Sequence, residues 1–258
     1  MDNSFLEFLH KIRLFEIDYV LKQLKITDSI LEIGGGAGFQ ANYISQLGYN
    51  ITSIDIESSV YSDNKIFPVH IYDGKNIPYP NQSFKVIFTS HVLEHITDYE
   101  NFYKECDRVL KKDGIMIHVV PTSTWRFWTT IAHYINVLKL LRKIFFAKTK
   151  KVSQVNDSEN HKSSQKISWI RRNIIHALCP PVHGEQGSFL SEIYYFSNHY
   201  WLNHFRKYKL KILYKQKIPI FYTGYLIFGK KNSLKNRMIK SKFLGSSSQL
   251  YLLSKAIG

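Results

Sequence analysis

The sequence predicts an α/β fold, in which a mostly parallel β-sheet carries helices on both faces. Two observations predict it. Short apolar runs typical of buried strands alternate with segments of helical spacing along residues 28–121, and parallel strands need such crossovers. The chain also has 258 residues with a hydrophobic fraction of 44%, which suits one large domain, or one domain with an insertion, and is ample to bury a core.

The elements follow in a regular order up to Pro121. Residues 4–24 have apolar positions at helical spacing and predict an amino-terminal helix. The remaining predictions in this half are strands at 29–33, 51–56, 84–89 and 115–120, and helices at 39–47 and 99–110. A glycine cluster ends the first strand and Pro121 ends the last, as expected for residues that interrupt regular structure.

The regular alternation breaks after Pro121. A long apolar and basic helix is predicted at 125–147, a polar and mobile segment at 148–168, a helix at 197–207, and a closing strand pair at 210–217 and 220–229. We therefore divide the chain into an N-terminal helix (1–27), a cofactor-binding core (28–121), a substrate lid or insertion (122–196), a closing helix and strand pair (197–230) and a basic C-terminal tail (231–258).

Composition excludes several classes of protein. Aromatic residues make up 15% of the chain and charged residues 21%, which excludes an intrinsically disordered chain. Two cysteines, Cys106 and Cys179, exclude a disulfide scaffold and suit a reducing compartment. We see neither a secretory signal nor an apolar run long enough to span a bilayer, and expect a cytoplasmic protein.

Charge is distributed unevenly along the chain. Residues 1–120 carry a net charge of −5, and residues 121–258 carry +20. Such asymmetry indicates a surface for a polyanion, whether nucleic acid, anionic lipid or a charged glycolipid. The alternative is that the lysines serve solubility alone.

The strongest motif is a glycine loop between the strand at 29–33 and the helix at 39–47. Gly34, Gly36 and Gly38 let the backbone turn tightly and approach a ligand closely. Asp55 follows 21 positions after Gly34, at the end of the next strand, where a carboxylate can accept both hydroxyls of a ribose. A dinucleotide fingerprint needs G-x-G-x-x-G, and here the third glycine comes one residue early.

The pattern Glu32-x-Gly34-x-Gly36-x-Gly38 resembles class I S-adenosylmethionine-dependent methyltransferases. Residues 71–79 and 83–96 resemble the adenine loop and the fourth motif of the subgroup related to quinone-biosynthesis methyltransferases. The resemblance implies a Rossmann-like, seven-stranded, mostly parallel sheet, with an inserted lid between the fifth and sixth strands. It also implies S-adenosyl-L-methionine as cofactor, bound by Glu32, Gly34, Gly36, Gly38, Asp55, Ile56, Asp73, Gly74 and Ser90.

Three histidines are the catalytic candidates: His91, His95 and His183. A hydroxyl acceptor must lose a proton during methyl transfer, and histidine titrates near neutral pH. His91 and His95 lie in the fourth motif, where the resemblance implies acceptor orientation or proton removal; a structural hydrogen bond at a helix start is the alternative for His95. His183 lies in the proline-rich loop 180–185, where Glu185 could orient its ring.

No metal is expected. Glu94 and His95 could join a divalent cation, but nothing else in the sequence completes that set of ligands. The two cysteines do not resemble zinc ligands either, because no C-x-x-C motif occurs.

Residues 125–146 have the pattern of an interfacial helix. Apolar and aromatic residues lie at helical spacing on one side, and Lys139, Arg142 and Lys143 fall mainly on the other. This pattern favours contact with an anionic membrane; a lid helix with its apolar face turned inward is the alternative. We do not expect a nucleic-acid partner, because the aromatics share one apolar face instead of alternating with a basic groove.

We expect a methyltransferase that acts on oxygen. The segments 183–184 and 221–225 resemble, more weakly, methyltransferases associated with bacterial surface polysaccharides. They suggest a sugar hydroxyl on a glycan or lipid-linked glycan as acceptor, and a protein peripheral to the inner face of the membrane. The alternatives are a quinone or lipid methyltransferase and a non-catalytic module that retains cofactor binding; the oligomeric state stays open.

Overall fold

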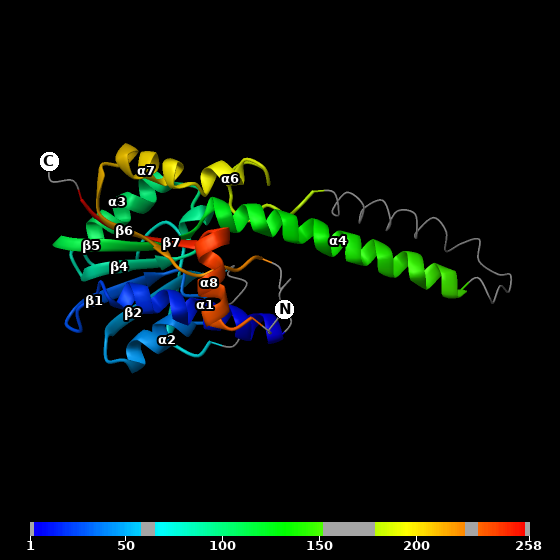
Figure 1. Cartoon of the computed structure of the whole chain (residues 1–258). Coiled ribbons are helices and arrows are strands. Elements are labelled where there is room, and N and C mark those ends of the chain that lie inside the picture. Colours follow the sequence, from blue (N-terminus) through cyan, green and yellow to red (C-terminus); the bar gives the residue numbers. More distant parts are fainter. Residues whose placement is uncertain (1–2, 58–64, 152–178, 225–231, 256–258) are drawn as a thin grey trace, which may run out of the picture.

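One seven-stranded sheet organises the chain. In the computed structural model, which describes residues 3–57, 65–151, 179–224 and 232–255, the strand order is β3-β2-β1-β4-β5-β7-β6 (Figure 1). The strands are β1 (Ser29–Ile33), β2 (Asn50–Ile56), β3 (Val69–Tyr72), β4 (Phe84–Ser90), β5 (Leu110–Pro121), β6 (Leu210–Ile218) and β7 (Ser248–Lys255). β7 is antiparallel to both neighbours, and the pairs among β1 to β5 are parallel. The predicted mostly parallel, seven-stranded fold is confirmed.

Helices cover both faces of this sheet. They are α1 (Asn3–Leu21), α2 (Phe39–Gln46), the 3-10 turn η1 (Leu93–His95), α3 (Tyr99–Val109), α4 (Ser123–Lys151), α6 (Glu192–Tyr195), α7 (Asn198–Lys207) and α8 (Leu234–Leu244). Leu31 faces the cluster that includes α3 and α7, while its neighbour Ile30 faces the cluster that includes α1 and α2. Successive side chains of β1 therefore point into two separate hydrophobic cores, one on each face of the sheet.

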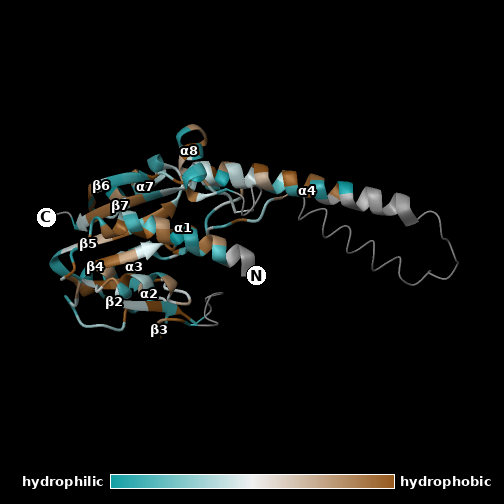
Figure 2. Cartoon of the chain, turned by 60° about the horizontal axis from the view of Figure 1, so that its bottom comes forward, coloured by the Kyte–Doolittle hydropathy of each residue, from teal (hydrophilic) through white to brown (hydrophobic). Residues whose placement is uncertain are grey.

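The insertion lies between β5 and β6, as expected. α4 begins beside the end of β5 and then leaves the body of the domain, and it projects in both views (Figures 1 and 2). Residues 179–196 return to the domain and end in α6. Among the described residues, no helix combines the length and the apolarity needed to cross a lipid bilayer.

Two predictions for the C-terminal part, a strand at 220–229 and a basic tail at 231–258, were wrong. Residues 220–224 form no strand, and residues 225–229 of the expected strand lie outside the described residues, as do residues 152–168 of the segment expected to be mobile. The strand that completes the sheet is β7, which lies between β5 and β6 with its first six residues buried. Residues 231–258 are therefore not a basic tail, because they supply α8 and β7. Lysines on α8 obscured the apolar run Leu250–Leu253 that follows.

Candidate active site

The glycine loop lies where the carboxyl ends of β1 and β2 meet. The backbone amides of Gly34 and Gly35 both donate to the carbonyl of Ile54, at 2.8 and 3.1 Å. Gly34 has φ of 83°, and a Cβ there would lie 2.3 Å from a methyl carbon of Val92. A Cβ on Gly35 would lie 1.9 Å from the Ser53 hydroxyl. A side chain at either position would displace Val92 or Ser53, so glycine lets the loop pack over the strand ends.

Glu32 offers a buried acceptor to this loop. Its Oε2 accepts a hydrogen bond of 2.6 Å from Ser53, and its Oε1 has no hydrogen-bond partner among the described residues. Burial raises the pKa of Glu32 to about 7; the Ser53 hydrogen bond opposes this shift, and the charge of Asp55 adds to it. A buried carboxylate oxygen without a donor fits a ligand that brings a positive charge.

Asp55 is held by the loop and keeps spare acceptor capacity. Its Oδ2 accepts from the amide of Gly36 at 2.6 Å, and its Oδ1 accepts from the amide of Ile56 at 2.7 Å. A carboxylate offers about four lone-pair positions, so two more hydrogen bonds are available for ribose hydroxyls. Ile56 is exposed beyond it, beside Gly74, and presents an apolar surface at the end of β2.

The other predicted cofactor residues lie at the same edge of the sheet. Asp73 is exposed, and its carboxylate accepts from the amides of Lys75 and Asn76 and from the side-chain amide of Asn76. These hydrogen bonds, the one from the Asn76 amide foremost, lower the pKa of Asp73 and close its loop. Ser90 is buried at the end of β4, and its hydroxyl has no hydrogen-bond partner among the described residues.

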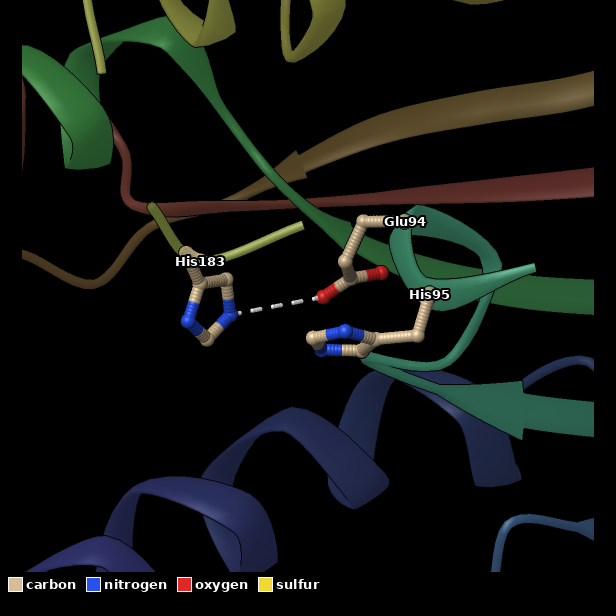
Figure 3. A group of neighbouring side chains, drawn as sticks. All are labelled: Glu94, His95 and His183. Atoms are coloured by element: carbon tan, nitrogen blue, oxygen red, sulfur yellow. Dashed lines mark ion pairs between the residues drawn. The ribbon is translucent and has the colours of Figure 1, made fainter. Parts of the chain in front are cut away.

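Glu94, His95 and His183 come together next to this edge (Figure 3). One ligand-type atom from each residue lies within 4.8 Å of the other two. Glu94 and His95 belong to η1, and the Nε2 of His183 reaches across from the insertion to within 3.8 Å of the Glu94 Oε1. Burial would raise the pKa of Glu94, but the neighbouring histidines, His183 first, bring it below its usual value. The carboxylate is therefore ionised at neutral pH.

His91 lies behind Glu94 instead of beside His183. Its Nδ1 is 3.7 Å from Glu94, and its Nε2 is 3.3 Å from Glu16 on α1. Burial, together with the charge of Arg13, lowers the pKa of His91. Glu16 in turn receives a hydrogen bond of 2.6 Å from Arg13, which holds the pKa of that carboxyl at about 2 in spite of burial. The structure thus places His91 in a buried charge network that links α1 to η1.

Hydrogen bonds to Glu192 and close packing fix the loop that carries His183. The amides of His183 and Gly184 donate to the same oxygen of Glu192, at 2.7 and 2.6 Å, and the other oxygen of Glu192 pairs with Arg126 of α4 at 2.9 Å. A Cβ on Gly184 would lie 2.8 Å from the backbone oxygen of Glu94. The ring of His183 also packs on that of Trp125, with centroids 4.6 Å apart.

The prediction that Glu185 orients the ring of His183 was wrong. Glu185 lies near His95, with its Oε1 at 3.9 Å from the Nδ1, and Glu94 takes the place expected for it beside His183. The sequence analysis also missed Glu16, Arg126 and Glu192. No local spacing could have found them, because each acts across a contact between segments far apart in the chain.

A separate hollow of about 740 Å³ lies elsewhere on the molecule. It is lined by residues at the end of α7, the start of β6 and the end of β7. Ligands of open α/β sheets bind at the carboxyl ends of the parallel strands, and this hollow lies where β6 begins. The glycine loop and the Glu94 cluster are therefore the candidate active site.

Comparison with known proteins finds methyltransferases. A family model described as a methyltransferase domain matches residues 31–118. A probable S-adenosylmethionine-dependent methyltransferase of Mycolicibacterium smegmatis is 31% identical over 96 residues, which are 36% of this chain and 37% of that protein. A ubiquinone biosynthesis O-methyltransferase of Pelagibacter ubique is 26% identical over 191 residues, covering 65% of this chain and 80% of the relative.

A solved structure supports the fold over nearly the whole chain. An S-adenosylmethionine-dependent methyltransferase of Mesorhizobium loti aligns with a TM-score of 0.52 at 10% identity, covering 93% of this chain and 97% of that one. By contrast, the chain spans less than two fifths of the length of the Mycolicibacterium relative. The family model ends at residue 118, so it includes the glycine loop, Glu94 and His95 but not His183.

Proposed function

We propose that this chain, whose residues 31–118 form a class I S-adenosylmethionine-dependent methyltransferase domain, transfers the methyl group of that cofactor to a hydroxyl oxygen. The matching methyltransferase-domain model and the relatives named as S-adenosylmethionine-dependent methyltransferases support the family and the cofactor that the glycine loop predicts. The choice of oxygen rests on one observation, which is the Glu94, His95 and His183 cluster at the edge of the sheet that carries the glycine loop.

The cofactor residues have complementary roles. The unpaired oxygen of Glu32 would meet the positively charged methionine end, and the glycine loop would let that end approach the strands. Asp55 would accept the ribose hydroxyls, and Ile56 and the loop at Asp73 would flank the adenine. When bound, the cofactor supplies a methyl group on a sulfonium, which is already an activated leaving group.

The cluster of Glu94, His95 and His183 would remove the proton from the acceptor hydroxyl. During transfer a carbon–oxygen bond forms, the carbon–sulfur bond breaks, and the hydroxyl proton must leave. His183 or His95 can accept that proton, since the ionised Glu94 next to them stabilises an imidazolium. The loop that carries His183 also holds the acceptor side of the site against η1, which helps to exclude water.

A sugar hydroxyl on a glycan or lipid-linked glycan is the acceptor we propose. Its support is the weak resemblance of residues 183–184 and 221–225 to methyltransferases associated with surface polysaccharides, together with the net charge of +20 after residue 120. A quinone or lipid hydroxyl is the second candidate, and it is favoured by the similarity to the ubiquinone biosynthesis O-methyltransferase of Pelagibacter ubique.

We also propose that α4 contacts the inner face of an anionic membrane. Its polar residues Thr129 and His133 are buried against the domain. Five of its apolar residues are exposed, whereas Trp125 and Ala132 are buried. We call the exposed ones the α4 apolar face, and they are Phe127, Tyr134, Ile135, Leu138 and Leu141. Lys139 and Arg142 are exposed nearby. An outward apolar face beside basic residues suits an interfacial helix better than a lid packed by its apolar side.

Transfer of a labelled methyl group tests the enzymatic function. The full chain would be incubated with S-adenosylmethionine carrying a labelled methyl, and with glycan, quinone and RNA fractions separately. We expect label in the glycan or lipid-linked glycan fraction. Label in the quinone fraction would favour the second candidate, and label in RNA would overturn both. Cofactor binding without transfer to any fraction would indicate a binding module.

Co-sedimentation with vesicles tests the membrane proposal. We expect binding to anionic vesicles and partial release by salt, because the Debye length falls from about 10 Å at 0.1 M to about 3 Å at 1 M. The double change of Leu138 and Leu141 to Asp should abolish binding. Phe243→Asp is the matched control, since Phe243 is 82% exposed on α8 and is not part of the α4 apolar face. Equal failure to bind anionic and neutral vesicles would contradict the proposal.

A further inference from the structure

The donor set at the cluster is that of a metal centre. Glu94 offers a carboxylate oxygen, and His95 and His183 each offer an imidazole nitrogen, all three within 4.8 Å of one another (Figure 3). Bonds from a divalent metal to such atoms measure about 2.0–2.2 Å, so two ligand atoms on one ion lie roughly 3–4 Å apart. The His183 to Glu94 separation of 3.8 Å is already in this range.

The Glu94 carboxylate lacks the partners that a buried charge requires. Its side chain is fully buried, and neither oxygen has a hydrogen bond within the part of the chain that the structure describes. His91 and His183 approach only to 3.7 and 3.8 Å. Buried carboxylates are normally hydrogen-bonded, paired with a cation at close range, or bound to a metal. The unpaired oxygens are therefore a second indication of a ligand.

We propose that Glu94, His95 and His183 bind a divalent transition-metal ion such as Mn²⁺, Co²⁺ or Zn²⁺. Two imidazoles and one carboxylate favour these ions over Mg²⁺ and Ca²⁺, which prefer oxygen ligands. Three protein ligands leave coordination positions open, as in catalytic centres and unlike closed structural sites.

The surroundings of the cluster hold the ligands in place before a metal arrives. Glu94 and His95 are neighbours on η1, and the amide of Glu185 donates to the backbone oxygen of Glu94 at 3.0 Å. Glu192 fixes the backbone on both sides of the His183 carbonyl through its two hydrogen bonds. A metal would therefore join the loop of the insertion to the core of the domain, at the point where Gly184 already lets them touch.

A metal bound by Glu94, His95 and His183 would also restrict which acceptors fit the site. Resting on the proposed function, we infer that the acceptor carries two neighbouring oxygens, such as the vicinal hydroxyls of a sugar, which can fill two open positions together. Coordination makes a hydroxyl more acidic. Its proton would pass to Glu185 or to water, and the resulting oxygen would form the new bond to the methyl carbon as the carbon–sulfur bond breaks.

This role differs from proton removal by an imidazole. A histidine nitrogen bound to a metal cannot accept a proton at the same time. His183 and His95 therefore act either as ligands or as bases, and a measurement of metal binding decides between the two.

Titration of the full chain with Co²⁺, free of any affinity tag, tests the proposal. Calorimetry measures affinity, and the visible absorption of Co²⁺ reports imidazole coordination. We expect one tight site per chain. His183→Ala should weaken it by about 100-fold or more, beyond the 10–100-fold typical of changes outside the ligand set. His199→Ala is the matched control, because His199 is exposed on α7, outside the cluster, and its loss should leave the affinity unchanged.

Folding is checked separately, through binding of S-adenosylhomocysteine to the same preparations. His183 is part of a loop and not of the cofactor core, so this binding should persist in His183→Ala. Equal Co²⁺ affinity in the wild-type chain and His183→Ala would overturn the proposal, as would the absence of a site tighter than millimolar. Metal binding without methyl transfer would uphold this site and contradict the proposed function. Methyl transfer that withstands a chelator, in a chain that binds no metal, would do the reverse.

Discussion

The two halves of the candidate active site are built in different ways. The cofactor half consists of Glu32, the glycine loop and Asp55, which lie within 24 consecutive residues of the sequence. The acceptor half joins η1 to a loop almost ninety residues later, and Glu192 and Arg126 hold that loop in place. The first half is encoded locally, whereas the second depends on contacts between distant segments.

This difference explains why the family model includes all of the cofactor half but only part of the acceptor half. The family model ends at residue 118, so it includes Glu94 and His95 but not His183. A methyl donor is common to many reactions, whereas each acceptor needs its own shape. Because the two halves of the site are built separately, we expect a change in one half to leave the function of the other half intact. The following variants test that independence.

The largest effect is expected from His183→Ala. Loss of a base lowers turnover by about 10²–10⁴-fold, and we expect loss of a metal ligand at this position to fall in the same range. The affinity for S-adenosylmethionine should stay within about twofold, since His183 lies outside the cofactor half. Steady-state turnover and calorimetry on the same preparation measure the two quantities.

His199→Ala again serves as the control for loss of a histidine. A large loss of cofactor affinity in His183→Ala would show that the two halves of the site are coupled. Unchanged turnover would remove His183 from the mechanism altogether.

Asp55→Ala should affect the opposite half. The variant loses a charged acceptor for ribose hydroxyls and also the hydrogen bond that holds the Gly36 amide. Hydrogen bonds to charged groups contribute about 1.5–3 kcal/mol, so cofactor affinity should fall by about 10–150-fold. Calorimetry with S-adenosylmethionine measures it. Glu57→Ala, an exposed carboxylate two residues later, should leave affinity unchanged, and equal affinities for both variants would contradict the assignment.

Gly184→Ala tests the contact between the halves. The added Cβ would lie 2.8 Å from the backbone oxygen of Glu94, and a backbone atom cannot move aside cheaply. Overpacking of this kind costs about 1–3 kcal/mol. We expect turnover to fall as the loop moves away, and the melting temperature to fall by about 2–4 °C per kcal/mol. Glu185→Ala, at the next position, should leave the melting temperature unchanged; an unaltered melting temperature and turnover in Gly184→Ala would contradict the close contact.

The sequence predicted what local pattern encodes. The glycine loop, Asp55 and the strands β1, β2, β4 and β5 follow from short motifs, because a parallel strand and its crossover helix are contiguous in the chain. The four-residue strand β3 (Val69–Tyr72) was not predicted. β7 was missed because its position in the sheet depends on pairing with β5 and β6, which are distant in sequence. The pairing of His183 with Glu94 was missed for the same reason, since Glu185 was the nearer carboxylate in sequence.

α4 shows a further limit of sequence patterns. Its amphipathic spacing predicted a helix, and the helix is present. Spacing alone could not tell which face turns inward. Arg126 is buried because Glu192 pairs with it, and the apolar residues Leu138 and Leu141 remain exposed. Burial on this helix follows from the partners that it meets, and those partners lie in other segments.

The smallest effect is expected from pH, through its action on cofactor binding. Burial raises the pKa of Glu32 to about 7, so without cofactor this carboxyl is mostly ionised at pH 8 and mostly neutral at pH 6. A cationic cofactor favours the ionised form, and it must displace the proton at the lower pH. Affinity should therefore fall by about tenfold from pH 8 to pH 6, as expected for one coupled proton. Calorimetry at several pH values measures this change. Glu32→Gln should bind S-adenosylmethionine more weakly at pH 8 and lose the pH dependence; a slope that survives this substitution would assign the titration to another group.

A second ligand shows which positive charge Glu32 meets, because S-adenosylhomocysteine keeps the ammonium but lacks the sulfonium charge. An equal slope for both ligands would place Glu32 beside the ammonium, and a slope seen only with S-adenosylmethionine would place it beside the sulfonium.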